Sequence, residues 1–210
     1  MASATSTSPF RFGVIILAAG ASSRMGTPKQ LLPLGGKPLL LHTVEAALAS
    51  AAWPVVVVLG AQAEKIRPLL ARHPVIVVEN SAWSEGMASS IRTGIMALQQ
   101  FSRAFDAALV ALCDQPAFSA DTIVQLLAAQ RATSRSITAA RYHGRNGAPA
   151  LFLREHFPAL GALTGEEGAR ALLNPADANL RDAICTVELP EFGADLDTPR
   201  DYQAMQAQQQ

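Results

Sequence analysis

The sequence predicts an α/β protein with a doubly wound, mostly parallel (Rossmann-like) sheet and helices on both of its faces, in three α/β/α layers. Short runs rich in Val, Ile and Leu have the composition of strands that are buried on both faces, as a parallel sheet requires. Amphipathic helical patterns separate these runs. Regular alternation of strand and helix produces βαβ units, and such units wind a parallel sheet.

The first half of the chain carries the clearest alternation. Strands are expected at Phe12–Ala18, Pro54–Leu59, Val75–Val78 and Ala107–Leu112. Helices are expected between them at Pro38–Ser50, Ala63–Arg72 and Met87–Gln100. In the first of these helices, Leu40, Val44 and Ala47 recur at the spacing of one helix face, which favours packing on a sheet.

The second half is less regular. A helix is expected at Ser119–Arg131, with Ser119 as its N-cap. The remaining expected elements are strands at Ser136–Arg141, Ala148–Leu153 and Ala183–Glu188, a helical turn or two at Glu166–Leu173, and a closing helix at Thr198–Gln208. No internal repeat or linker interrupts the sequence. We therefore expect a single domain at residues 11–210 after a flexible N-terminal tail at residues 1–10.

Composition limits the partners of the protein. The 210 residues carry 17 basic and 17 acidic side chains, so the formal net charge is zero. No overall field draws such a chain to nucleic acid or to an anionic membrane, and an anion site must be local. No apolar run approaches the ~18 residues typical of a membrane span, and Cys113 and Cys185 lack the spacing of a zinc site. We expect a cytoplasmic protein with neither nucleic acid nor membrane as a partner.

The loop after the first expected strand, Leu17-Ala-Ala-Gly-Ala-Ser-Ser-Arg-Met-Gly-Thr-Pro-Lys29, is the first candidate site. Ligands of open α/β sheets bind beyond the carboxyl ends of the strands. Small residues let backbone N–H groups approach phosphate oxygens, and Arg24 and Lys29 add positive charge. The spacing fits neither a P-loop nor a GxGxxG dinucleotide fingerprint. On residue types alone, a phosphate site and an ordinary turn with two surface cations are equally good interpretations.

Acidic residues near the ends of other elements suggest a metal site. Asp114 follows the expected strand Ala107–Leu112, where a carboxylate is well placed to hold a cation over the end of the sheet. Mg²⁺ prefers oxygen ligands, usually one or two carboxylates together with phosphate oxygens. The alternative for Asp114 is an Asx turn or N-cap before Pro116. Asp195 and Asp197 precede the closing helix; Asp197 could simply cap it, an explanation that does not apply to Asp195.

A third candidate segment, Glu79–Ser90, runs from a strand end into the N-terminus of a helix. Gly86 and the serines of this segment leave hydrogen-bond donors available to a ligand. The alternative is a capped helix start, and we expect Trp83 to be packed in the core. Elsewhere, His143 is expected to be a surface-loop residue rather than a catalyst.

The run LAAGASSRMGTPKQLLPLGGKPLL resembles the signature loop of the MobA-like nucleotidyltransferases, and within them most closely the molybdenum cofactor cytidylyltransferase (MocA-like) branch. The resemblance extends to N-x-x-W-x-x-G-M-x-x-S at residues 80–90, D-Q-P at 114–116, G-x-P-x-x-F at 147–152, a segment similar to G-D-x-G-A-R at 165–170, and D-L-D-T-P-x-D at 195–201. Glu166 stands where the family often has Asp, which is a mild departure. The motifs cover nearly the whole chain.

The resemblance implies a role for each candidate. Residues of the nucleotide site are implied to be Leu17, Ala18, Ala19, Gly20, Arg24, Lys29, Asn80, Gly86, Met87 and Ser90. The implied catalytic residues are Lys29, Arg24 and Asp114, and the implied ligands of Mg²⁺ are Asp114, Asp195 and Asp197. On the acceptor side, the implied residues are Gly147, Pro149 and Arg170. Arg170 has two open interpretations, a contact with an acceptor phosphate or an ion pair with Glu166 at i, i+4.

The implied reaction is transfer of CMP from CTP to the phosphate of molybdopterin, with release of pyrophosphate and with Mg²⁺ as cofactor. Ala19 before Gly20 favours CTP, whereas the branch with two glycines at this point tends to use GTP. A molybdenum hydroxylase that receives the product is a further expected partner. Two alternatives stay open: transfer to a sugar or polyol phosphate, and a non-catalytic factor that binds cofactor for a molybdenum hydroxylase.

Overall fold

The computed structural model describes residues 10–23, 25–102, 104–194, 196 and 199–207. Within these residues the main sheet has seven strands in the order β5-β4-β1-β6-β8-β7-β9. β8 is antiparallel to β6 and β7, and the other neighbouring pairs are parallel. The strands are β1 Phe12–Ala18, β4 Val55–Leu59, β5 Ile76–Glu79, β6 Ala107–Leu112, β7 Ile137–Tyr142, β8 Arg145–Leu153 and β9 Ile184–Glu188.

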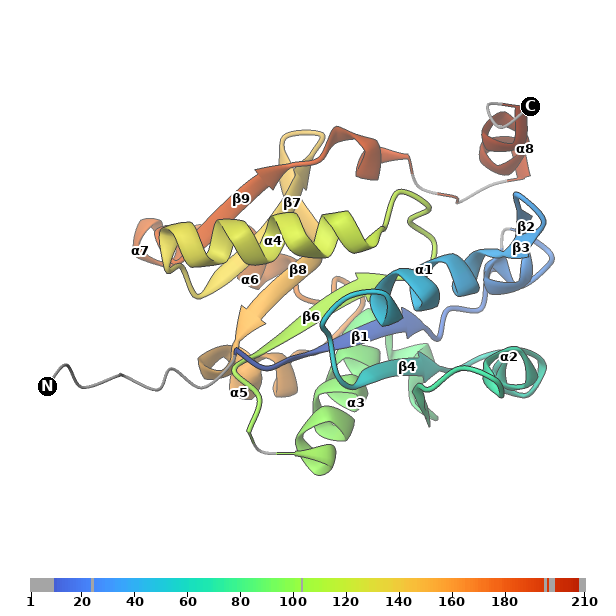
Figure 1. The fold of residues 1–210 in the computed structure, drawn as a ribbon, viewed down its shortest axis with the longest axis horizontal. Helices are drawn as coiled ribbons and strands as arrows, with labels where there is room; N and C mark the ends of the chain where they lie inside the picture. Colours follow the sequence, from blue (N-terminus) through green and yellow to red (C-terminus); the bar gives the residue numbers. More distant parts are fainter. Residues whose placement is uncertain (1–9, 24, 103, 195, 197–198, 208–210) are drawn as a thin grey trace, which may run out of the picture.

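Helices cover both faces of this sheet (Figure 1). One face packs against α1 (Leu39–Leu48), α2 (Ala63–Leu70) and α4 (Ala120–Thr133). The other face packs against α3 (Met87–Phe101), α5 (Phe157–Gly161) and α6 (Arg170–Leu173). In Figure 1, α1 and α4 lie in front of the sheet and α3 lies behind it. The predicted three-layer architecture with a mostly parallel sheet is confirmed.

The central strand β1 shows why core residues could be predicted from the sequence. All seven of its residues are buried. Because side chains alternate across a strand, Ile16 packs with the first group of helices, while Ile15 and Leu17 pack with the second. Gly94 lets α3 lie close to β1, since a Cβ atom there would be 2.3 Å from Cγ2 of Ile15. A strand covered on both faces appears in the sequence as an unbroken apolar run.

A small hairpin that the sequence analysis did not predict follows the first loop. It pairs β2 (Pro33–Leu34) with β3 (Lys37–Pro38). Gly35 and Gly36 form its turn with positive φ angles of 56° and 80°. Because a Gly-Gly pair suits a two-residue hairpin turn, the signal was present in the sequence, but strands of two residues are too short to show periodicity.

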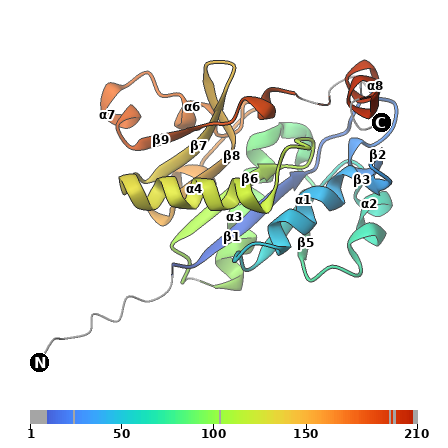
Figure 2. The ribbon, with the colours of Figure 1, turned by 45° about the horizontal axis from the view of Figure 1, so that its top comes forward.

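The closing helix α8 (Pro199–Ala207) lies beside this hairpin in both views (Figure 1, Figure 2). The hydroxyl of Tyr202 donates a hydrogen bond to the carbonyl of Pro33. Leu196 is fully buried and packs in one cluster with Leu34 and Leu39. The C-terminal segment is therefore attached next to the first loop.

Several predicted boundaries need correction. The helix expected at Glu166–Leu173 begins only at Arg170, because Gly165 and Gly168 adopt positive φ angles of 79° and 58° that a helix does not accommodate. β8 begins at Arg145 rather than at Ala148, since its first residues continue the hairpin with β7.

The predicted cap of α4 is confirmed: the hydroxyl of Ser119 accepts a hydrogen bond from the backbone N–H of Thr122 at 3.2 Å. Other elements were too short for the periodicity to predict: η1 Lys29–Leu31, η2 Trp83–Glu85, η3 Arg154–His156, α5, α7 Ala178–Arg181 and η4 Pro190–Gly193. Across the described ranges, every helix is too short or too polar to traverse a lipid bilayer.

Candidate active site

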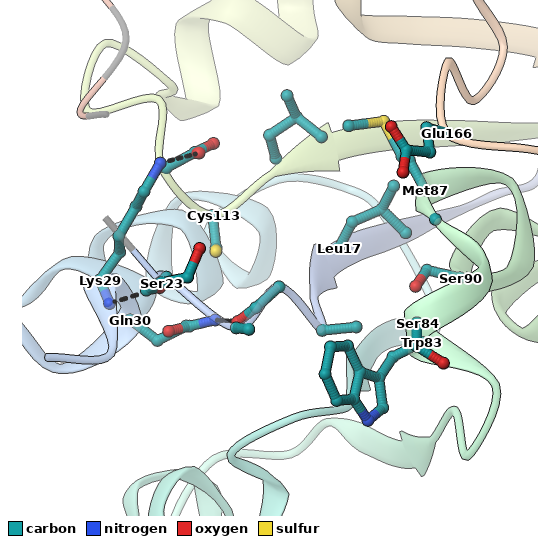
Figure 3. A pocket seen from close by; sticks show the side chains of 17 residues that line it. Leu17, Ser23, Lys29, Gln30, Trp83, Ser84, Met87, Ser90, Cys113 and Glu166 are labelled. Carbon is teal, nitrogen blue, oxygen red and sulfur yellow. Dashed lines mark hydrogen bonds and ion pairs between the residues drawn. The ribbon is translucent and has the colours of Figure 1, made fainter. Parts of the chain in front are cut away.

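A cavity of about 500 Å³ opens at the carboxyl ends of β1 and β6 (Figure 3). From β1 the chain crosses to β4 on one side, and it later returns to β6 on the other side. Ligands of doubly wound sheets bind at this kind of switch point. The lining residues come from the first loop, from the start of α3 and from the segment after β6: Leu17, Ala19, Gly20, Ala21, Ser22, Ser23, Lys29, Gln30, Trp83, Ser84, Gly86, Met87, Ser90, Leu112, Cys113, Asp114 and Glu166.

Gln30 holds the first loop in place and was missed by the sequence analysis. Its side chain is only 2% exposed. Its Nε2 donates to the carbonyl of Ala18 at 2.9 Å and to that of Gly20 at 3.1 Å. The hydroxyl of Ser22 accepts from the backbone N–H of Lys29 at 3.0 Å. These bonds pin both ends of the loop from within, and a single polar residue gives no periodic signal of such burial.

The loop brings a cation to the predicted metal ligand. The Nζ atom of Lys29 lies 3.2 Å from Oδ2 of Asp114, and the two side chains are 14% and 27% exposed. Asp114 sits beyond β6, as predicted, and Cys113 lies beside it in the cavity wall. Burial, together with the negative charge of Asp114, raises the pKa of the Cys113 thiol far above its ordinary value. The Cys113 thiol is therefore held in its neutral form in the cavity wall.

The described residues provide some, but not all, of the oxygen ligands that a hard divalent cation needs. Asp114 supplies a carboxylate oxygen, which is the ligand type that Mg²⁺ prefers. No group of three or more potential metal-ligating side chains forms within the part of the chain that the structure describes. The other predicted ligands, Asp195 and Asp197, and the predicted catalytic Arg24 lie outside the described residues.

Trp83 is a correction to the sequence analysis. It was expected in the core, but it is 38% exposed and lines the cavity from η2 (Figure 3). The reason is its position beyond the carboxyl end of β5, where the chain crosses the top of β4. Gly60, just after β4, allows the contact, because a Cβ atom there would be 2.7 Å from Cβ of Trp83.

The start of α3 reaches the cavity through Gly86, Met87 and Ser90. Asn80 lies beneath them rather than in the lining, and it is only 4% exposed. Its Nδ2 donates to Ser89 Oγ at 2.8 Å and to Ser90 Oγ at 3.0 Å, while its Oδ1 accepts from the backbone N–H of Ala82 at 3.0 Å. The side chain of Asn80 is thus engaged in supporting the wall that Ser90 presents.

Ala18 likewise lies behind the lining. Its methyl group belongs to the core beneath the loop, and its carbonyl oxygen accepts the bond from Gln30. Ala19 and Gly20, the next two residues, do line the cavity. Those predicted nucleotide residues that the structure describes therefore divide into a layer that faces the cavity and a layer, Ala18 and Asn80, that supports it.

A second cavity of about 300 Å³ adjoins the first, and the two share Leu17, Met87 and Leu112 in their walls. Its walls are apolar, with Val110, Ala150, Phe152 and Leu173, and its polar lining includes Arg145, Asn146 and Arg170. These residues come from β6, from the β7–β8 hairpin and from α6.

The predicted acceptor residues lie in or near this second cavity. Gly147 and Arg170 line it, whereas Pro149 is buried beside them and is not part of the lining. Nη1 of Arg170 pairs with Glu167 at 3.2 Å. Of the two open interpretations of Arg170, the i, i+4 pair with Glu166 is therefore not formed, because α6 starts only at Arg170. Glu166 faces the first cavity instead.

His143 occupies the β7–β8 turn with a positive φ of 49°. It is exposed, as expected, but it also lines the second cavity. Its imidazole ring packs close to Gly193, where a Cβ atom would be 2.5 Å from the ring. A turn residue thus forms part of the wall of the second cavity.

Known proteins share this fold and sequence pattern. The MobA-like NTP transferase domain matches residues 14–182. The nicotine blue oxidoreductase of Paenarthrobacter nicotinovorans is 35% identical over 88% of this chain and 91% of its own length. The purine catabolism protein PucB of Bacillus subtilis is 30% identical over 93% of this chain and 95% of its own length. Among solved structures, Rv0371c of Mycobacterium tuberculosis superposes with a TM-score of 0.77 at 26% identity, covering 94% of this chain and 98% of the other.

Proposed function

This chain belongs to the MobA-like NTP transferase family, and from that premise we propose that it transfers CMP from CTP to the phosphate of molybdopterin, with release of pyrophosphate. The observation that carries the proposal is the pair of adjoining cavities. One holds the loop, Lys29 and Asp114, and the other is apolar with arginines in its lining. Because they share Leu17, Met87 and Leu112, ligands in the two cavities would meet at this wall.

The proposed reaction is a displacement at the α-phosphorus of the nucleotide. A phosphate oxygen of the acceptor forms the new bond to phosphorus, the bond to the bridging oxygen of the β-phosphate breaks, and pyrophosphate leaves with that oxygen. The attacking phosphate is already an anion at neutral pH, so the step needs no covalent enzyme intermediate and no strong general base. The barrier is repulsion between anions, which position and electrostatics lower.

The residues of the first cavity have the properties that this step needs. Backbone N–H groups of the small residues after Ala19 can approach the phosphates closely. Lys29, together with Arg24, would neutralise charge on the leaving pyrophosphate. Asp114, with Asp195 or Asp197, would hold Mg²⁺, and the bound ion would screen the repulsion between the phosphates of the two substrates.

The second cavity supports a flat, anionic acceptor. Phe152, Val110 and Leu173 provide an apolar surface. Arg145 and Arg170 are the cationic side chains of the same lining, and Arg170 is paired there with Glu167. A pterin that carries a phosphate group combines these two features. The choice of CTP over GTP rests on Ala19 before Gly20, which resembles the branch that tends to use CTP.

One relative supports a second candidate function. The nicotine blue oxidoreductase is named for a redox activity, and an oxidoreductase of this kind would need a bound electron carrier. The sequence does not contain the GxGxxG fingerprint that holds a dinucleotide on a Rossmann-type first turn. The loop is built instead from residues that match the nucleotidyltransferase signature, so we place the redox activity second.

A panel assay separates these functions. The purified protein is incubated with Mg²⁺ and molybdopterin and with CTP, GTP, ATP or UTP in turn, and pyrophosphate release is measured. Parallel samples contain NADH or NADPH and nicotine blue, and loss of the reduced nicotinamide is followed by absorbance. We expect pyrophosphate with CTP only when molybdopterin is present. Turnover with a sugar phosphate alone, or nicotinamide oxidation without any pyrophosphate, would contradict the proposal.

A further inference from the structure

One arginine outside both cavities connects the segments that form them. Arg92 lies on α3, and its Nη1 donates to the carbonyl of Leu163 at 2.6 Å. Its Nη2 donates to Oε2 of Glu85 at 2.7 Å, in the turn that carries Trp83. A single planar guanidinium group therefore hydrogen-bonds both to Glu85 and to Leu163, which are far apart in the sequence. The side chain of Arg92 is partly buried.

The segment that Arg92 holds, residues 163–169, packs directly on the start of α3. The backbone N–H of Ala88 donates to the carbonyl of Gly165 at 3.3 Å. A Cβ atom on Gly86 would lie 2.6 Å from Cα of Glu166, and one on Gly168 would lie 2.8 Å from Sδ of Met87. Because the backbone of Gly86 contacts that of Gly165 and Glu166 directly, and the side chain of Met87 packs on Gly168, a displacement of one segment is transmitted to the other.

This segment contributes to both cavities at once. Glu166 lines the first cavity, while Glu167 and Ala169 line the second. Met87, which packs on Gly168, lies in the shared wall. The position of residues 163–169 therefore sets the shape of both cavities, and Arg92 is the charged side chain that fixes this position from the side of α3.

We propose that Arg92 is a positioning residue that couples the two cavities, so that a nucleotide in the first orders the segment 163–169 and strengthens binding in the second. The inference rests on the proposed function for the identity of the ligands. Coupling of this kind is reciprocal, because each ligand changes the affinity of the other by the same factor. Lysine cannot replace arginine fully, since its single ammonium group lacks the planar pair of donors that reaches Leu163 and Glu85 together.

Three variants test the coupling. Arg92→Ala removes both contacts, and Arg92→Lys keeps only the charge. Arg67→Ala is the matched control, because Nη2 of Arg67 pairs with Oε2 of Glu79 at the same 2.7 Å, between α2 and β5, and neither residue lines either of the two adjoining cavities. The measurements are the Kd of CTP with Mg²⁺ by calorimetry, hydrogen exchange of residues 163–169 with and without CTP, and the KM of molybdopterin.

In the unmodified protein, CTP should slow hydrogen exchange in residues 163–169. In Arg92→Ala, CTP should bind within about threefold of normal but no longer slow this exchange, and the KM of molybdopterin should rise about tenfold, the value of roughly one charge-assisted hydrogen bond. Arg92→Lys should recover less than half of the lost protection, and Arg67→Ala should change neither quantity.

The outcomes distinguish the inference from the function on which it rests. Equal protection by CTP in Arg92→Ala and the unmodified protein overturns the coupling, whether or not pyrophosphate is formed. Failure of the unmodified protein to form pyrophosphate contradicts the proposed function, whereas protection by CTP that depends on Arg92 still supports the coupling. An equal rise in KM for Arg67→Ala overturns the inference, because it shows a general loss of stability.

Discussion

The two cavities differ in how the chain builds them. The first is formed by loops at the carboxyl ends of the parallel strands β1 and β6 and by the start of α3. The second takes much of its wall from β8, which runs against the direction of its neighbours, and from the short helix α6. In the first cavity, the charged side chains Lys29 and Asp114 lie close to the backbone of the loop. In the second cavity, apolar side chains form most of the wall.

This difference separates two tasks. Binding phosphates needs small residues, fixed cations and a carboxylate, and these can be held by short loops on rigid strands. Binding an acceptor needs a shaped apolar surface, which side chains from several distant segments must supply together. Changes in the first cavity should therefore lower the rate of the chemical step, and changes in the second should raise the KM of the acceptor.

The largest effect should come from Asp114→Asn. The amide keeps the shape of the side chain but removes the charge, so the proposed Mg²⁺ site would lose a ligand, and Lys29 loses the carboxylate at 3.2 Å. We expect kcat for pyrophosphate release to fall about a thousandfold, with little change in the KM of the acceptor. Asp106→Asn is the control, because Asp106 lies at the opposite end of β6 and accepts from the backbone N–H of Arg11. If Asp114→Asn raised only the acceptor KM, the division of tasks would be wrong.

A smaller effect is expected for Lys29→Met. At ~4 Å and an effective dielectric constant of ~20, one charge contact is worth about 4 kcal/mol before desolvation. Desolvation of the charges offsets part of this, so we expect a fall in kcat of roughly a hundredfold, or about 2.7 kcal/mol. Lys65→Met, on the surface of α2, should leave kcat within about twofold. Because Lys29 contacts Asp114, the double variant should lose less than the product of the two single losses. If the fall in kcat of the double variant, measured by the same pyrophosphate assay, equalled the product of the two single falls, Lys29 and Asp114 would not act together.

The same contrast explains what could be predicted from sequence. The buried strand Phe12–Ala18 could be predicted from its unbroken apolar run, and Asp114 could be predicted as a site residue because it is a charge directly after another such run. The supporting contacts of Gln30 and Asn80 could not be predicted, because burial of a single polar side chain depends on loops that meet only in the folded chain. The prediction that Trp83 is buried was wrong, because an apolar side chain can line a cavity as well as pack in the core, and the residue type does not distinguish the two.

The second cavity was still harder to predict from the sequence. Its lining residues on β8 and in the segment 167–174 are separated in the sequence, and they belong to no common period. Only the family resemblance drew attention to Gly147 and Arg170, and it assigned them no geometry. The wall formed by Phe152 and Leu173 follows from the antiparallel pairing of β8 and from the late start of α6, neither of which the sequence analysis predicted.

Gly147→Ala should give the smallest effect and sharpen the contrast between the cavities. A Cβ atom at this position would lie 2.3 Å from the hydroxyl oxygen of Tyr142, so the tyrosine must shift within the wall of the second cavity. Crowding of this kind costs about 1–3 kcal/mol, and we expect the acceptor KM to rise about tenfold while the KM of CTP stays within about twofold. Gly161→Ala, where a Cβ atom meets nothing within 4 Å, is the control. If the KM of CTP rose as much as that of the acceptor, the two cavities would have to be treated as one binding site.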